Sequence, residues 1–146
     1  MNINIKCPHC GTVSLVNCVS GMEQKSLACP KCQVVSKVGD YLPKLSLRTG
    51  DTTHQLHFGK QWVGRESKSN DAEIQMPDAT RYMSRHHALI EVTCSAQGLL
   101  TTIEEHGKNP TELQGVELTE GDIIYLNVND CVKIGDRRMY LANEYE

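Results

Sequence analysis

The chain has 146 residues, a hydrophobic content of 39%, a charged content of 23% and a formal net charge of −3. These values are typical of a folded globular protein and argue against a disordered or strongly basic chain. No stretch approaches the roughly 20 apolar residues that cross a membrane, and the first residues contain no apolar core of a secretory signal, so we expect a cytoplasmic protein without membrane attachment.

Four of the seven cysteines form two C-x2-C pairs near the N-terminus, separated by 18 residues. Each pair places two sulfurs on one tight turn, and four thiolates at about 2.3 Å suit a tetrahedral zinc ion. We expect residues 12–19 and 24–28 to supply a hairpin that joins the two knuckles. Because four protein ligands leave no open position, the metal would be structural. The sequence therefore predicts one structural Zn²⁺ held by Cys7, Cys10, Cys29 and Cys32.

Two other interpretations of these cysteines are disulfides and a thioredoxin-like redox pair. A redox pair should follow a strand in a βαβ unit, and no such unit is visible in the sequence. The pattern, with its Ile5-x-Cys7-Pro8-x-Cys10-Gly11 opening, resembles the zinc-ribbon family over roughly residues 3–36. The composition changes near residue 40, where Gly39–Pro43 suits a short boundary. We therefore predict a zinc ribbon over residues 1–40 and a second domain over residues 44–146.

The second domain alternates short apolar runs with turn residues. No window predicts an amphipathic helix, and the runs show the two-residue period of half-buried strands. About ten strands in about 100 residues favour an antiparallel β-sandwich, so the predicted fold class is all-β. The predicted strands are Lys44–Arg48, His54–Phe58, Gln61–Val63, Glu73–Gln75, Ala88–Thr93, Leu99–Glu104, Thr111–Leu113, Ile123–Leu126, Cys131–Ile134 and Met139–Asn143.

Three polar segments fall between these strands, and loops at one end of a sandwich can converge on one ligand. Arg65 offers the planar fork of donors that suits a phosphate, and Ser84 adds a short hydroxyl donor. The amide of Asn109 can donate and accept, which suits the main chain of an extended peptide. None of the three is a nucleophile paired with a base. The set is predicted to hold a phosphate rather than cleave it, so we expect no enzymatic activity.

The segments Trp62-Val63-Gly64-Arg65, Met83-Ser84-Arg85-His86-His87-Ala88 and Lys108-Asn109-Pro110-Thr111 resemble, in order, the signature loops of the forkhead-associated (FHA) family. A later Leu118-x-x-Gly121-Asp122-x-Ile124 turn resembles that family too, and the likeness covers about residues 44–143. It implies an eleven-stranded sandwich that binds phosphothreonine peptides. Arg65 and Ser84 would hold the phosphate, and Asn109 would fix the peptide main chain. Further implied roles are weaker charge contacts from Arg85 and Lys108, a buried imidazole of His87 that braces the Ser84 loop, and support from Gly64 and Thr111.

Two positions depart from the family pattern. The usual Asn-Gly-Thr is Asn109-Pro110-Thr111 here, and proline fixes φ near −65° and removes an N–H. The later Asn-Gly of the family is Gln114-Gly115, one methylene longer. These changes would narrow the range of peptides that bind or weaken their binding, but they leave Arg65 and Ser84 in place.

The leading hypothesis is thus a phosphothreonine-binding adaptor with a structural zinc ribbon, whose partner is a phosphorylated substrate of a Ser/Thr kinase. A first alternative is a sandwich that has lost phosphate binding and serves as an interaction scaffold. A second is a nucleic-acid or transcription-complex contact through the ribbon. Residues 1–43 hold four lysines against two acidic residues, which is few positive charges for nucleic acid, so we expect none as a partner.

Overall fold

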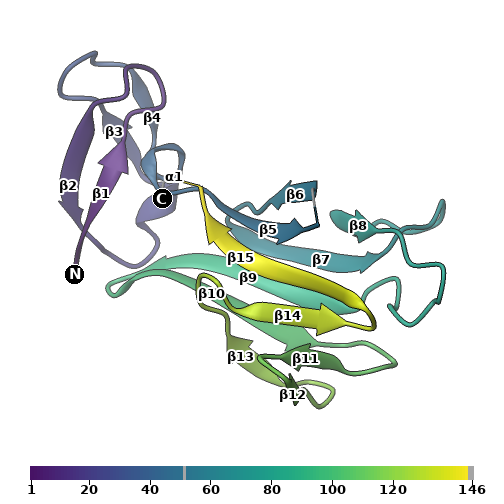
Figure 1. The fold of residues 1–146 in the computed structure, drawn as a ribbon. Coiled ribbons are helices and arrows are strands. Elements are labelled where there is room, and N and C mark those ends of the chain that lie inside the picture. The colour runs from purple at the N-terminus through teal and green to yellow at the C-terminus, as the bar shows by residue number, and fades with distance from the viewer. Residues whose placement is uncertain (51, 145–146) are drawn as a thin grey trace.

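The computed structural model of the chain describes residues 1–50 and 52–144, which form a small cysteine module (residues 1–41) and a β-sandwich (Figure 1). The two lie side by side, with the module against one end of the sandwich. In the part of the chain that the structure describes, no helix is long and apolar enough to cross a membrane.

The cysteine module is built from two antiparallel hairpins. Strand β1 pairs with β2, and β3 pairs with β4. Each cysteine pair occupies the turn of its own hairpin, so the expected single hairpin between the two knuckles is wrong. The elements are β1 (Asn2–Lys6), β2 (Val13–Asn17), the 3-10 turn η1 (Met22–Gln24), β3 (Ser26–Ala28), β4 (Val35–Lys37) and the short helix α1 (Val38–Tyr41).

The backbone of the two knuckles explains this arrangement. The N–H of Cys7 donates to the carbonyl of Thr12 at 2.9 Å, and the N–H of Cys29 donates to the carbonyl of Val34 at 3.1 Å. Each knuckle is therefore closed by residues on both of its sides, and one shared hairpin could not close both. A left-handed residue ends each turn: Gly11, with φ 78°, and Gln33, with φ 63°.

The sandwich follows the cysteine module as two facing sheets. The described residues contribute β5 (Leu45–Thr49), β6 (Thr52–Gln55), β7 (Gly59–Arg65), β8 (Ile74–Met76), β9 (Ala88–Ser95), β10 (Gly98–Glu105), β11 (Thr111–Leu113), β12 (Val116–Glu117), β13 (Ile123–Tyr125), β14 (Cys131–Ile134) and β15 (Arg137–Asn143). One sheet has the order β13-β10-β9-β7-β8 and the other β12-β11-β14-β15-β5-β6. Among the described residues every pairing is antiparallel except β7 with β8, which confirms the predicted all-β sandwich.

The core of the sandwich follows the predicted alternation. Along β9, every second residue from Ala88 to Cys94 is buried, because successive side chains in a strand point to opposite faces. The predicted strand His54–Phe58 is correct only at its start: β6 spans Thr52–Gln55, and beyond it the Gln61 side chain binds the N–H and carbonyl of His57. The short strand β12 was not predicted.

A second, smaller core joins the cysteine module to the sandwich. Its buried members from the module and the connecting segment are Ile5, Cys7, Cys18, Met22, Cys29, Tyr41 and Leu42, and they pack with Cys94 of β9. The N–H of Gly21 also donates to the Cys94 carbonyl at 3.2 Å. The hydroxyl of Tyr41 lies 3.2 Å from the carbonyl oxygens of Leu27 and Val34, to which it donates. The segment between the two predicted domains is therefore packed rather than exposed.

Leu42 provides a test of this second core. Its side chain is 0% exposed, so Leu42→Ala should lower the free energy of unfolding by about 2–5 kcal/mol through lost burial and a residual cavity. The control is Val35→Ala, because Val35 is 65% exposed. Urea unfolding would measure both variants, and equal stability of the two would contradict a packed junction.

Candidate functional site

The first component of the site is the end of strand β7. The N–H of Arg65 donates to the carbonyl of Ser84 at 2.9 Å, which places the two predicted phosphate ligands on adjoining segments. The neighbouring Gly64 has no room for a side chain, since a Cβ there would lie 1.5 Å from the carbonyl oxygen of Arg85. Glycine at this position therefore lets the loop of Ser84 and Arg85 pass directly over the strand.

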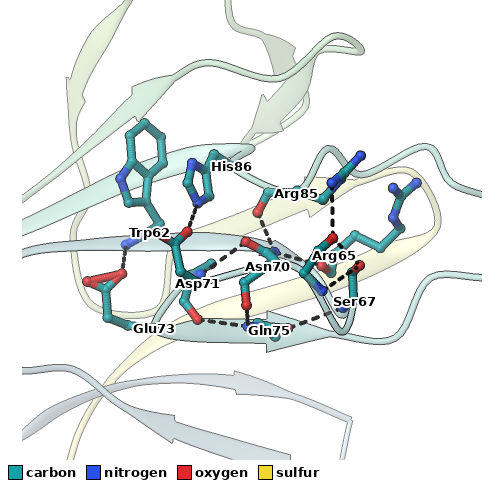
Figure 2. Close-up of polar contacts among 11 residues, drawn as sticks. Trp62, Arg65, Ser67, Asn70, Asp71, Glu73, Gln75, Arg85 and His86 are labelled. Carbon is teal, nitrogen blue, oxygen red and sulfur yellow. Dashed lines mark hydrogen bonds and ion pairs between the residues drawn. The ribbon is translucent and has the colours of Figure 1, made fainter.

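Asn70 joins the two arginine-bearing segments from the other side (Figure 2). Its side-chain N–H groups donate to the carbonyl of Arg65 at 2.8 Å and to that of Arg85 at 2.7 Å. The amide of Gln75 donates in turn to the carbonyl of Asn70 at 2.8 Å. The main chain at Arg65 and Arg85 is thus fixed without using either guanidinium group.

His87 occupies the centre of the site and is 0% exposed. Its Nδ1 accepts the N–H of Ser84 at 2.9 Å, so Nε2 carries the proton of the neutral ring. Nε2 lies 3.7 Å from a carboxylate oxygen of Glu105. Burial lowers the pKa of His87 below its usual range, although the charge of Glu105 opposes this shift. A Cβ on Gly107 would lie 2.2 Å from the imidazole, so the next loop packs directly on the ring.

That next loop, residues 106–110, is held by a buried carboxylate. Glu105 is 1% exposed, and its two oxygens accept the N–H of Gly107 at 2.9 Å and the N–H of Thr111 at 2.5 Å. Hydrogen bonds of this kind are what allow a charged group to remain buried. Thr111 itself is fully buried, and its position follows from this contact.

Further contacts tie this loop to the Ser84 segment. The hydroxyl oxygen of Ser84 accepts the N–H of Lys108 at 3.0 Å. The Asn109 amide donates to the carbonyl of Tyr82 at 3.0 Å, and the Tyr82 hydroxyl donates to the carbonyl of Pro110 at 3.0 Å. Asn109 therefore uses one side-chain N–H for a hydrogen bond within the protein. Its second side-chain N–H and its side-chain oxygen are the groups that can bind a ligand.

These segments surround one surface pocket of about 390 Å³, which we call the phosphate pocket. It collects all five residues that were predicted to contact a phosphopeptide, whereas Gly64, His87 and Thr111 lie behind it. Its lining also includes residues that the sequence did not single out, among them Arg81, whose φ is 59°. The lining residues are Arg65, Arg81, Tyr82, Met83, Ser84, Arg85, Lys108 and Asn109.

The four paired cysteines form a second candidate site in the cysteine module. Their sulfur atoms all lie within 4.8 Å of one another, with Cys7 and Cys32 3.7 Å apart and Cys10 and Cys29 3.6 Å apart. A tetrahedron with metal–sulfur bonds of about 2.3 Å has edges of about 3.8 Å, so the cluster has the right size for zinc.

Local donors also favour thiolates in this cluster. The hydroxyl and main chain of Thr12 lower the pKa of Cys10 to about 6. The N–H groups of Cys32 and Lys31 lower the pKa of Cys29. At Cys32 the main-chain contact with Val34 lowers the pKa, but burial and the other three cysteines outweigh it and raise the pKa to about 11. Because the thiolate is the form that binds metal, the local donors favour binding at Cys10 and Cys29, and the fit of all four cysteines rests on their geometry.

Comparison with known proteins identifies the sandwich. A sequence profile of the FHA domain matches residues 62–135, which is just over half of the chain. The chain belongs to the FHA family. No curated protein sequence matches it significantly. The match includes every residue assigned above to the phosphate pocket.

Solved structures agree on the FHA fold. The MEK1 FHA domain in complex with a HOP1 phosphothreonine peptide has a TM-score of 0.57 and 18% identity, covering 68% of this chain and 96% of that one. The yeast splicing factor Pml1 has a TM-score of 0.61 and 18% identity, covering 69% and 80%. The FHA domain of CT664 from Chlamydia trachomatis has a TM-score of 0.55 and 21% identity, covering 68% and 97%. At sequence identities this low, the structural likeness shows a shared fold and no more.

Some residues that line or support the phosphate pocket were not found from the sequence. Asn70, Arg81 and Glu105 carried no signal, because each is a common polar residue in or next to a loop. A search for the acceptor of each loop N–H would have pointed to Glu105, since buried backbone donors in folded proteins are almost always paired. The conformation of Arg81 has no sequence signature, because left-handed φ is ordinary only for Gly, Asn and Asp.

The buried imidazole predicts a pH dependence of stability. Burial lowers the pKa of His87 in the folded FHA domain, so its ring stays neutral to a lower pH than in the unfolded chain, where it takes up a proton near pH 6.5. The unfolded state then binds more protons, so the free energy of unfolding should fall as pH falls below about 6.5 toward the lowered pKa. His87→Gln, which keeps an acceptor for Ser84, should flatten this part of the curve. Urea unfolding between about pH 8 and about pH 5 would test it, and parallel curves for the two proteins would contradict the assignment.

Proposed function

We propose that this FHA domain is a non-enzymatic adaptor that binds phosphothreonine in a partner protein, and that the cysteine module serves as a structural zinc ribbon. The observation that carries the proposal is the convergence of Arg65, Ser84, Arg85, Lys108 and Asn109 on one pocket of an FHA fold. The related MEK1 FHA domain, which was solved with a phosphothreonine peptide, adds support.

The proposed chemistry is a charge-dependent switch. Phosphorylation gives a threonine close to two negative charges and strong acceptor oxygens, enough for one to three charge-assisted hydrogen bonds. Arg65 and Ser84 would hold the phosphate, with weaker contributions from Arg85 and Lys108. The free donor and the oxygen of Asn109 would meet the peptide main chain. An unmodified threonine offers the arginine nothing to pair with, so binding would follow kinase activity.

The contacts of Ser84 favour binding over hydrolysis. The Nδ1 of the buried His87 accepts a hydrogen bond from the main-chain N–H of Ser84, and the hydroxyl oxygen of Ser84 accepts one from the main-chain N–H of Lys108. A nucleophilic serine instead needs its hydroxyl proton aimed at a base. His87, Gly64 and Thr111 would act behind the pocket by fixing its loops. We place the partner among the cytoplasmic substrates of a Ser/Thr kinase.

Arg65→Ala tests the phosphate pocket. Loss of a charge-assisted pair costs about 1.5–3 kcal/mol, so affinity for phosphothreonine peptides should fall at least about tenfold while the melting temperature stays near that of the parent chain. The control is Lys60→Ala, which removes one charge from the exposed, opposite end of the same strand β7. Binding would be measured on degenerate peptide arrays centred on phosphothreonine, phosphoserine or threonine.

Two results of that array would overturn the assignment. Retained phosphothreonine affinity in Arg65→Ala would remove Arg65 from the site. Equal binding of phosphorylated and unmodified peptides by the folded, metal-loaded parent would favour a phosphate-independent interaction scaffold. Affinity for DNA or RNA that depends steeply on salt would instead point to the zinc ribbon as the active part.

Cys29→Ser tests the proposed zinc ligands. Binding of a structural metal supplies folding free energy to a small module, so this variant should contain less than one zinc per chain and should melt at a lower temperature. Cys131→Ser is the matched control, because Cys131 lies in β14 of the sandwich. Metal analysis after dialysis against a chelator gives the readout, and unchanged zinc content in Cys29→Ser would contradict the ligand set.

A further inference from the structure

A second pocket of about 480 Å³, which we call the side pocket, adjoins the phosphate pocket. The two share the same three arginines, Arg65, Arg81 and Arg85. The rest of the side pocket comes from the loop after β7 and from the segment before Arg81. Its remaining lining residues are Glu66, Ser67, Ser69, Asp78 and Ala79.

The side pocket offers more donors than acceptors. Each arginine carries five N–H donors, and two serine hydroxyls add to them. Of the two carboxylates, Asp78 is already used by its own turn: one oxygen accepts the N–H and hydroxyl of Thr80, and the other accepts the N–H of Met83 at 2.8 Å. Glu66 is exposed to solvent. Three guanidinium groups therefore face the pocket against two carboxylates, a balance of one positive charge, and the acceptor oxygens of Asp78 are already occupied.

The side chain of Arg85 is directed toward the side pocket. Its Nη1 donates to the hydroxyl of Ser69 at 3.2 Å, and that hydroxyl lies 3.3 Å from the hydroxyl of Ser67. Figure 2 shows the guanidinium groups of Arg65 and Arg85 on the same side of this loop, near Ser67. A phosphate bound mainly by Arg65 and Ser84 would thus leave donors of Arg85 and the two serine hydroxyls available to another anion.

Arg81 lies between the two pockets at the end of a tight turn. Its N–H donates to the carbonyl of Asp78 at 3.2 Å, and its φ of 59° is left-handed. A residue other than glycine in this conformation costs on the order of 1 kcal/mol or more. Because Arg65, Arg81 and Arg85 line the same two pockets, an anion bound there would offset the repulsion between their like charges.

We propose that the side pocket binds a second anionic group of the same ligand. The preferred ligand is then a phosphothreonine peptide with a further phosphorylated or acidic residue near the phosphothreonine. This inference rests on the proposed function and names the ligand class of the same site. Because both groups belong to one peptide, the second contact forms at high effective concentration and adds to affinity without a second association step.

The test uses phosphothreonine peptides in which each flanking position is phosphoserine, aspartate or alanine in turn, with the full zinc-loaded chain. At one or more positions phosphoserine should raise affinity about tenfold over alanine, the effect of one charge-assisted contact. An equal gain with aspartate identifies an acidic residue as the second group, and a gain with phosphoserine alone identifies a second phosphate. Both of these results support the side pocket.

Variants separate this inference from the proposed function. Ser69→Asp places a carboxylate beside Arg85 in the side pocket and should remove the gain, measured as the ratio of the affinities for the doubly and the singly phosphorylated peptide in the same variant. Ser69→Asn is its neutral control. Arg81→Ala should also remove the gain, whereas Lys68→Ala, which removes an exposed charge from the same loop outside the pocket lining, should not.

The failures are distinguishable. Normal binding of singly phosphorylated peptides with no gain at any flanking position would overturn the side pocket and leave the phosphate pocket standing. A gain that survives in both Ser69→Asp and Arg81→Ala would place the second anion elsewhere and would overturn the inference too. Absence of binding to every phosphorylated peptide would overturn the proposed function together with it.

Discussion

The phosphate pocket depends on the environment of one buried imidazole. The Nδ1 of the His87 ring accepts the N–H of Ser84. The main-chain N–H of His87 donates to the carbonyl of Val63, and its main-chain carbonyl accepts the N–H of His106. Three chain segments that are distant in sequence therefore meet around one residue, and Gly107 packs on the face of the ring. The contact with Ser84 needs an unprotonated Nδ1, so the burial that lowers the pKa of His87 also preserves that contact, whereas the other two hydrogen bonds are made by the main chain.

Buried polar groups position the loops, and this leaves the arginines available to a ligand. The Glu105 carboxylate fixes residues 106–111 through two backbone N–H groups, and the Asn70 amide fixes the main chain at Arg65 and Arg85. Neither guanidinium is needed to hold its own loop. Preorganisation of this kind reduces the ordering cost of binding, because the loops are placed before a ligand arrives. The same hydrogen bonds explain why the Glu105 carboxylate can be buried close to His87: each of its two oxygens accepts a backbone N–H.

Local patterns in the sequence predicted the fold well but predicted the supports of the site poorly. The alternation of Leu45 and Leu47 and the period of β9 reflect side chains that point to opposite faces of a strand, and such patterns are visible in single strands. The spacing of the cysteines likewise encodes short turns. The roles of Asn70 and Glu105 depend on which loops lie opposite them, and the burial of Leu42 and Cys94 in one core depends on two modules meeting. Contacts between distant segments leave no periodic signature, so these features required the structure.

The two candidate sites lie at opposite ends of the same strands. Strand β9 begins beside His87 and ends at Cys94 and Ser95, where the cysteine module packs, and β10 returns from that junction to Glu105. Figure 1 shows the module at the end of the sandwich away from the loops after β7 and β10. Between the ends lies the packed core of the sandwich, which resists deformation. A change at the four cysteines would therefore act first on the second core around Leu42, whereas the loops around His87 are held by contacts within the sandwich itself. The stability of the cysteine module and the geometry of the phosphate pocket are thus set by separate groups of residues.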